Sequence, residues 1–167
     1  MPIIRKAVLE DAERIIEINI NSWQDTYKGI FPDAFLLSLN NKKETSVEKC
    51  RENIDEYVVA VDEKKDNKIV GFARIGINKK EYPDKYGEIY SLYLDKGYKK
   101  KKIGTELVNY CFSLLKDNYD HCLISTLEEN SANEFYKKIG GKNIGQCDFN
   151  LQDEKYTENI YVYDFIE

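Results

Sequence analysis

The sequence predicts an α/β fold in which helices flank a mixed, mostly antiparallel central sheet of six to seven strands. Three observations lead to this prediction. Two strand-like segments between residues 57 and 75 are separated by a short polar stretch, as in a β-hairpin. A further strand-like segment, a lysine-rich loop and an amphipathic helix then follow. The chain ends as strand, helix and two aromatic-rich strands, an order that produces a mixed sheet.

The first half of the chain supplies one strand, three helical segments and the hairpin. Apolar residues recur at helical spacing after residue 9, and Glu10 and Asp11 suit a helix start because they face its positive end. Pro32 suits the start of a second helical segment. We expect a strand over residues 3–7, helices over 9–23, 32–39 and 43–53, and strands over 57–61 and 69–75.

The second half carries the strand, basic loop and helix that form the central unit of the fold. One face of the helix after the loop is apolar, through Ile103, Leu107, Val108, Cys111, Phe112 and Leu115. No repeat, Pro-rich linker or low-complexity tract divides the chain, so we expect a single domain over residues 1–167. We expect strands over 88–94, 122–127, 142–149 and 158–165, and helices over 103–115 and 131–139.

Composition narrows the class of protein. The chain has 167 residues, 42% of them hydrophobic, which suffices for one packed core. Its net charge of -5 and pI near 5.1 argue against a nucleic-acid backbone as the main partner and favour a cationic small molecule. No apolar stretch resembles a signal peptide or a membrane span, so we expect a cytoplasmic protein without a membrane partner.

The cysteines predict neither disulfides nor a metal site. Cys50, Cys111, Cys122 and Cys147 are widely spaced and form no CxxC pair, and His121 is the only histidine. We therefore expect buried free thiols and no bound metal.

The lysine-rich loop is the most unusual feature of the sequence. Five lysines fall within residues 96–102, immediately before a predicted helix. The first amides of a helix lack intrahelical partners and attract anions, so a pyrophosphate is a suitable ligand. Gly104 would permit its close approach. One alternative is a solvated run of surface lysines. Another is a nucleic-acid-binding patch, which the net negative charge of the chain disfavours.

This loop resembles the acyl-CoA-binding motif of the GNAT superfamily of N-acetyltransferases, which usually reads Q/R-x-x-G-x-G/A. Lys99 stands at the Q/R position and Gly104 at the last position, but Lys102 replaces the first glycine. The Lys102 side chain must therefore point away from the pyrophosphate or alter the loop. The resemblance implies that acetyl-CoA is the cosubstrate and that it binds through Leu92, Tyr93, Leu94, Lys99, Lys100, Lys102, Ile103, Gly104 and Thr105.

A second segment, residues 129–141, resembles the later family motif N-x-x-x-x-F-Y-x-K-x-G. The resemblance implies that Asn130 bonds pantetheine, that Phe135 and Lys138 belong to the cofactor site, and that Tyr136 protonates the leaving thiolate. It also implies that the strand over 88–94 splays from a parallel neighbour over 122–127. An ordinary capped helix with a core Phe-Tyr pair is the alternative reading of the segment.

Residues on the acceptor side are less sharply indicated. Glu88 matches the place where many relatives carry a base, although a strand-end surface charge is the alternative, and Glu128 or Glu129 are possible substitutes. The segment containing Trp23, Tyr27 and Phe31 resembles the acceptor-side region of one GNAT subgroup, although the spacing also suits core aromatics.

The resemblance implies an N-acetyltransferase in which an amine attacks acetyl-CoA directly within a ternary complex, without a metal. The acceptor is a small-molecule amine or a peptide amino group. A CoA-binding sensor or partner-binding domain without turnover is the rival interpretation, and an RNA-associated protein is a third. Assembly into a homodimer is a further alternative to a monomer.

Overall fold

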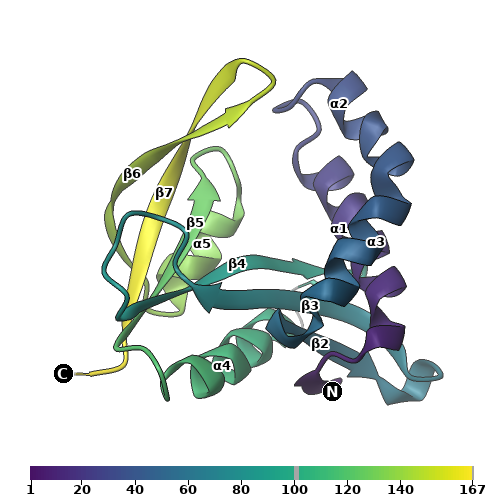
Figure 1. The fold of residues 1–167 in the computed structure, drawn as a ribbon, viewed down its shortest axis with the longest axis horizontal. Helices are drawn as coiled ribbons and strands as arrows, with labels where there is room; N and C mark the ends of the chain where they lie inside the picture. Colours follow the sequence, from purple (N-terminus) through teal and green to yellow (C-terminus); the bar gives the residue numbers. More distant parts are fainter. Residues whose placement is uncertain (100–101, 167) are drawn as a thin grey trace. The chain divides into compact units, whose positions relative to one another are not determined.

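The structure is a computed structural model that describes residues 1–99 and 102–166 (Figure 1). Its strands form one seven-stranded sheet in the order β1-β2-β3-β4-β5-β7-β6. The strands are β1 (Ile3–Lys6), β2 (Tyr57–Asp62), β3 (Lys68–Ile77), β4 (Tyr86–Leu94), β5 (His121–Leu127), β6 (Lys142–Leu151) and β7 (Glu154–Asp164). The α-helices are α1 (Ala12–Thr26), α2 (Asp33–Ser38), α3 (Lys43–Glu52), α4 (Ile103–Leu115) and α5 (Ala132–Lys138). Short 3-10 turns occupy Leu9–Asp11, Leu39–Lys42, Ile54–Glu56 and Glu63–Lys65.

The sheet is mixed, as the sequence predicted. The β1-β2, β2-β3, β5-β7 and β6-β7 pairs are antiparallel, whereas β4 and β5 run parallel. The parallel ladder extends only from Tyr86 opposite His121 to Ile89 opposite Ile124, and both strands continue beyond it. The predicted fold class, a mixed sheet of seven strands with a parallel pair, is therefore confirmed.

The predicted element order is confirmed throughout, and the main differences lie at element ends. Helix α1 continues to Thr26, three residues past the predicted end. Strand β7 begins at Glu154 instead of residue 158, because β6 and β7 join through a tight turn. Gln152 and Asp153 in this turn have φ of 48° and 66°, the left-handed geometry that matches the twist of a two-residue hairpin.

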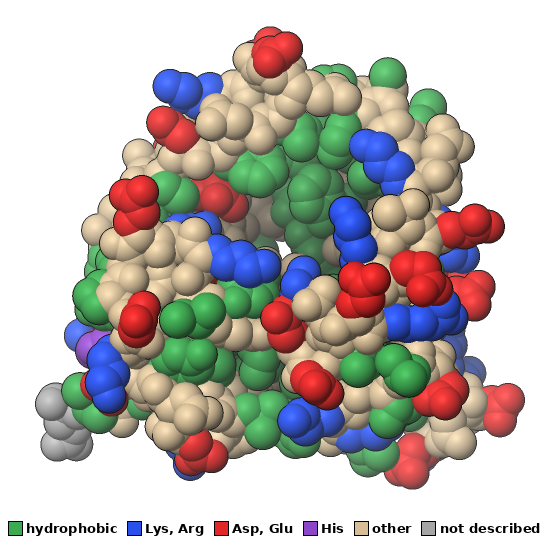
Figure 2. All heavy atoms as spheres, viewed as in Figure 1, with side chains coloured by type: hydrophobic (Ala, Val, Ile, Leu, Met, Phe, Trp, Pro, Cys, Tyr) green, Lys and Arg blue, Asp and Glu red, His purple; other side chains and the backbone are tan. Residues whose placement is uncertain are grey.

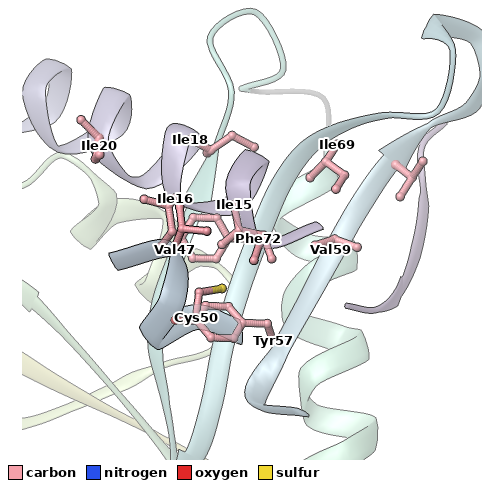
Figure 3. Close-up of a cluster of buried hydrophobic side chains, with 12 residues drawn as sticks. Ile15, Ile16, Ile18, Ile20, Val47, Cys50, Tyr57, Val59, Ile69 and Phe72 are labelled. Atoms are coloured by element: carbon pink, nitrogen blue, oxygen red, sulfur yellow. The ribbon is translucent and has the colours of Figure 1, made fainter. Parts of the chain in front are cut away.

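The chain folds as two compact units, each built from two segments. The first comprises Met1–Ile75 and Ser91–Cys111. In it, α1 and α3 lie side by side (Figure 1), and their apolar faces pack with β2 and β3. Figure 3 shows this cluster, in which Ile15 and Ile18 of α1 are fully buried beside Phe72 and Val59 of the sheet. The prediction of one domain over residues 1–167 stays a prediction.

The second unit comprises residues 76–90 and 112–166 of the described chain. Its core cluster contains Leu123, Ile160 and Val162, with Tyr82 and Tyr86 packed against it. Strands β6 and β7 form a long hairpin at the C-terminal end of the chain (Figure 1), and most side chains of β6 are exposed. The buried residues of this unit therefore come mainly from β5 and β7 and not from β6.

All four cysteines are free thiols, as predicted. Cys50, Cys111 and Cys122 are at most 1% exposed, and only Cys147, on β6, is half-buried. Burial raises the pKa of the Cys111 thiol to about 12, because desolvation disfavours the thiolate.

Charged side chains of both signs are interspersed over the face shown in Figure 2. Within the described residues, no group of three or more His, Cys, Asp or Glu side chains is arranged to hold a metal ion. None of the helices in this part of the chain has the length and apolarity needed to cross a membrane.

Replacing Ile15 with Ala tests the core of the first unit. The change removes three methyl or methylene carbons from a fully buried position, so we expect the free energy of unfolding to fall by about 2–5 kcal/mol in a urea titration. The control is Leu37→Ala on α2, where the side chain is 66% exposed and the expected change is below about 0.5 kcal/mol. Equal losses in the two variants would contradict this assignment of the core.

Candidate functional site

The first turn of helix α4 has backbone amides without intrahelical acceptors. The carbonyl of Lys102 accepts a hydrogen bond from the Glu106 amide at 3.1 Å, so the helix begins immediately after Lys102. The next amides, of Ile103, Gly104 and Thr105, belong to the first turn and have no intrahelical acceptor by the geometry of an α-helix. Ile103 is 1% exposed and anchors this turn in the core of the first unit. The amides are therefore fixed in direction by a packed side chain.

Lys102 adopts the backbone conformation that favours glycine. Its φ is +63°, in the left-handed region, and its side chain is exposed. The first glycine of the motif falls at this position, so the loop keeps the glycine-type backbone although the residue is lysine. The exposed side chain and the left-handed backbone of Lys102 are compatible with a side chain that points away from a pyrophosphate, and that orientation stays a prediction.

Asp95 fixes the start of the basic loop. Its carboxylate accepts a hydrogen bond from Arg14 Nη2 at 2.6 Å and lies 3.2 Å from Lys68 Nζ. The Asp95 amide donates to the carbonyl of Val70 at 2.8 Å, and Arg14 Nε donates to the carbonyl of Ile69 at 3.1 Å. Helix α1, strand β3 and the loop are thus joined at one carboxylate.

The surroundings of Asp95 favour its charged form. Burial acts to raise the pKa of this carboxyl, but the positive charges of Arg14 and Lys68 and their hydrogen bonds outweigh burial and hold the pKa below its ordinary value. The loop then turns at Gly97, with φ of +93°, and the Tyr98 amide donates back to the Asp95 carbonyl at 3.1 Å. The Tyr98 hydroxyl donates to Asp62 at 2.9 Å, which gives the loop a second anchor.

The end of β4 carries Leu92, Tyr93 and Leu94, all half-buried. Leu94 packs closely over Gly71 of β3, where a Cβ would come within 2.6 Å of Leu94 Cδ2. A side chain at position 71 would therefore require the Leu94 side chain to shift. The hydroxyls of Tyr93 and Tyr27 lie 3.1 Å apart.

An open cavity of about 500 Å³ adjoins the loop in the first unit. One wall comes from α1 and the other from the end of β4 and the loop, through Asn21, Ser22, Gln24, Asp25, Leu94, Asp95, Lys96, Gly97 and Lys99. Both walls are mainly polar and each carries one carboxylate, Asp25 or Asp95, whereas the lysines lie on the loop wall. The cavity suits a polar, charged ligand.

The predicted acceptor-side aromatics form a packed cluster. Tyr27 and Phe31 are buried, with ring centroids 4.7 Å apart, and Trp23 lies 4.9 Å from Tyr27. The α1 residues on the cavity wall are instead the polar neighbours of Trp23. Contact of the three aromatics with an acceptor stays a prediction, and their packing is what the structure describes.

In the second unit, Asn130 and Asn133 organise the start of α5. Asn130 Oδ1 accepts a hydrogen bond from the Ala132 amide at 2.8 Å, so Asn130, and not Ser131, supplies the side-chain cap. Asn133 is 8% exposed, and its amide nitrogen donates to the carbonyls of Leu127, Glu128 and Asn130. Its Oδ1 accepts hydrogen bonds from Asn159 at 3.0 Å and from the Tyr161 hydroxyl at 2.6 Å.

Tyr136 is held by ring contacts and by hydrogen bonds to its backbone carbonyl. The side chain is 7% exposed, and its ring lies 5.4 Å from Phe135 and 6.1 Å from Tyr161. The Tyr136 carbonyl accepts from the Tyr163 hydroxyl at 2.7 Å and from the Gly141 amide at 3.0 Å. Lys138, at the end of the same helix, is exposed.

Glu88 is a buried carboxylate near the start of β4. The residue is 4% exposed, and its Oε1 accepts from the Lys79 amide at 2.9 Å. Its Oε2 lies 3.5 Å from Lys80 Nζ. The alternative of a surface charge at a strand end is therefore wrong.

The predicted site residues divide between the two units. The first unit carries the end of β4, the basic loop, the start of α4 and the three acceptor-side aromatics. The second carries Glu88, Asn130, Phe135, Tyr136 and Lys138. Lys100 lies outside the described residues.

Arg14, Asp95 and Asn133 were not singled out from the sequence. Arg14 is one of only four arginines, and an asparagine at position 133 is a poor helix former inside a predicted helix. In the structure Asn133 is buried and hydrogen-bonded, and Arg14 is half-buried and paired with Asp95.

Residues 16–163 match the model of the acetyltransferase (GNAT) family. The chain belongs to the GNAT acetyltransferase family. This membership agrees with the resemblance in both sequence motifs, and it makes the protein a member of a family of acyl-transferring enzymes.

Two curated GNAT relatives align over nearly the whole chain. The N-acetyltransferase YuaI of Bacillus subtilis is 28% identical over 159 residues, which cover 95% of this chain and 90% of YuaI. A spermidine N(1)-acetyltransferase of Thermoplasma acidophilum is 28% identical over 163 residues, which cover 92% of this chain and 96% of the relative.

Solved structures agree with the GNAT fold. The crystal structure of PaiA N-acetyltransferase from T. acidophilum, in complex with coenzyme A, has a TM-score of 0.77 and 26% identity, and the match covers 99% of both chains. A GCN5-related N-acetyltransferase from Rhodopseudomonas palustris has a TM-score of 0.75 at 16% identity, covering 99% of this chain and 96% of that one, which bears on the fold alone.

Lys102 offers a direct test of the loop backbone. A non-glycine residue in the left-handed region carries a cost of about 1 kcal/mol, so Lys102→Gly is expected to raise the free energy of unfolding by up to about 1 kcal/mol. Lys102→Ala removes the same side chain but keeps the strained backbone, so it should give no gain. Both values come from urea unfolding. A glycine variant no more stable than the alanine variant would contradict the left-handed assignment.

Asp95→Asn tests the anchor of the loop. The amide keeps the shape but removes the charge that holds Arg14 and Lys68, so the loop loosens while residues outside it are unchanged. We expect KM for acetyl-CoA to rise about 3- to 10-fold and kcat to change less than about 2-fold in steady-state kinetics. Glu48→Gln, which breaks the exposed pair with Arg51 on α3, is the control and should change neither constant. A fall in kcat without a rise in KM would contradict the role of Asp95.

Proposed function

We propose that this protein transfers an acetyl group from acetyl-CoA to a primary amine, by direct attack within a ternary complex. The observation that carries the proposal is the left-handed Lys102 before α4, because the loop keeps a glycine-type backbone where the family motif has glycine. Membership of the GNAT family and the likeness to a coenzyme A complex support the same cosubstrate.

The residues of the loop and of α4 suit a pyrophosphate. The first-turn amides of Ile103, Gly104 and Thr105 supply donors and the positive end of the helix dipole. Lys99 is exposed in the preceding loop and adds a positive charge. The backbone of Leu92, Tyr93 and Leu94 is proposed to pair with the pantetheine amides, with Asn130, Phe135 and Lys138 completing the cofactor site. Acetyl-CoA itself supplies the activated acyl group.

A small cationic amine is the proposed acceptor class. The spermidine N(1)-acetyltransferase of T. acidophilum is similar over nearly its whole length, which supports an amine of the polyamine type. Glu88 is buried and carries a negative charge that an ammonium group complements. Glu158 of β7 adds a second carboxylate, because Lys80 lies near both Glu88 and Glu158.

Two side chains are proposed to move protons. Glu88 accepts a proton from the acceptor's ammonium, directly or through water, so that a neutral amine nitrogen attacks the thioester carbon. The carbon-nitrogen bond forms and the carbon-sulfur bond breaks, and Tyr136 donates its hydroxyl proton to the leaving thiolate. The attacking nitrogen then loses its second proton to solvent water, and the Tyr136 phenolate takes a proton back from solvent. A phenol has an ordinary pKa of about 10 and a thiol about 8.5, so this transfer costs about 2 kcal/mol before the site contributes.

Acetyl transfer from acetyl-CoA to a panel of amines tests the proposal. The panel contains spermidine, putrescine, an amino acid and a peptide with a free terminus, and each product is identified by mass spectrometry. Transfer to a polyamine is the expected result. Tight CoA binding without transfer to any amine would overturn the proposal in favour of a CoA sensor, and salt-sensitive RNA binding that CoA does not displace would favour the RNA-associated alternative.

Tyr136→Phe is the sharpest variant for the mechanism. Loss of the hydroxyl removes the proton donor but keeps the buried ring, so we expect kcat to fall about 10²- to 10⁴-fold with little change in acetyl-CoA affinity. Tyr156→Phe, on β7 opposite Phe149, is the matched control. An unchanged kcat in Tyr136→Phe would remove Tyr136 from the mechanism.

A further inference from the structure

Lys80 lies between two carboxylates in the second unit. Its Nζ is 3.5 Å from Glu88 Oε2 and 4.0 Å from Glu158 Oε1. The three side chains are largely shielded from solvent, with exposures of 22% for Lys80, 6% for Glu88 and 17% for Glu158. Interactions between charges are stronger in such a place than at an open surface.

The group has an excess negative charge. Two carboxylates face one ammonium, which leaves one negative charge without a counter-ion inside the cluster. Burial raises the pKa of the Glu158 carboxyl, and the nearby charge of Lys80 opposes that shift. Cys147 contributes only its thiol, 3.7 Å from Glu158 Oε1. One added ammonium would make the cluster neutral.

The segment that carries Lys80 is held in place by its neighbours. Asn78 Nδ2 donates to the carbonyls of Tyr82, Pro83 and Tyr86 at 3.2, 3.0 and 2.8 Å. The Tyr82 amide donates to the Lys80 carbonyl at 2.8 Å. The backbone of Lys80 is therefore fixed, whereas its side chain reaches Glu88 only through a flexible four-carbon stem.

The two oxygens of Glu88 have different roles. Oε1 is occupied by the backbone amide of Lys79 at 2.9 Å, a bond that orients the carboxylate. Oε2 faces the ammonium of Lys80, at a distance longer than an ideal charged hydrogen bond. Oε2 is therefore the oxygen of Glu88 that faces a cation.

Resting on the proposed function, we infer that Lys80 is a tethered counter-ion that competes with the acceptor's ammonium for Glu88. An incoming ammonium takes Glu88 Oε2, and Lys80 moves its charge to Glu158. The cluster becomes neutral when one cation enters. Lys80 therefore lowers the affinity for cationic acceptors and determines their charge specificity, without itself being a catalytic residue.

The test compares Lys80→Met with Lys79→Met. Both changes remove one positive charge from adjacent positions and keep the backbone amide of Lys79 that donates to Glu88. The Lys79 side chain lies over the Tyr90 ring, 4.2 Å from its centroid, instead of at Glu88. We expect KM for spermidine to fall about 10-fold in Lys80→Met, with a smaller fall for n-butylamine, which carries one charge. Lys79→Met should stay within about 2-fold of the wild type for both amines, and Lys80→Arg, which keeps the cation, should also stay close to it.

A binding measurement separates this inference from the proposed function. Calorimetric titration of spermidine into the CoA-loaded protein should give a Kd about 10-fold lower for Lys80→Met than for wild type. Equal Kd and KM values in Lys80→Met and Lys79→Met would overturn the inference alone. A wild-type protein that acetylates no amine would overturn the proposed function, and the calorimetric comparison would still decide the role of Lys80. If Lys80→Met does not fold, Lys80→Gln is judged by the same criteria.

Discussion

The ion pair between Arg14 and Asp95 is the constraint on which the basic loop of the first unit depends. The loop after Asp95 carries five lysines in seven positions, and their mutual repulsion favours an open, extended chain. Asp95 offsets this at the start of the loop, where it links α1 to β3, and Asp62 offsets it again through Tyr98. The part of the loop from Asp95 to Tyr98 is thus tied at two points to strands β2 and β3 and helix α1.

In the second unit, a neutral side chain, Asn133, holds a short helix in place. Helix α5 has seven residues, too few to be stable without tertiary support. Asn133 gives that support through three donated and two accepted hydrogen bonds at a position 8% exposed. An ionised residue there would carry a desolvation cost, whereas an amide has both donors and acceptors to offer its neighbours. The position of Tyr136 on α5 follows from this arrangement.

The order of elements could be predicted from the sequence because apolar periodicity and turn residues are local signals. The start of α4 was located to the residue by its amphipathic face, and the motif positions of Lys102 and Asn130 followed from spacing. The Arg14–Asp95 pair could not be found in this way, since its partners are 81 positions apart and neither belongs to a motif. The burial of Glu88 and its contact with Lys80 depend likewise on the path of the loop between β3 and β4, which no local pattern specifies.

The burial of the cysteines determines how the protein behaves toward thiol reagents. At neutral pH, a thiol with a pKa near 12 is almost entirely protonated, so Cys111 is a weak nucleophile as well as an inaccessible one. Cys50 and Cys122 are enclosed to the same degree. Disulfide-exchange dyes and mild oxidants therefore meet Cys147 first of the four. A label at this position would lie beside Glu158, and its fluorescence would follow changes in the charge of that neighbourhood without any engineered cysteine.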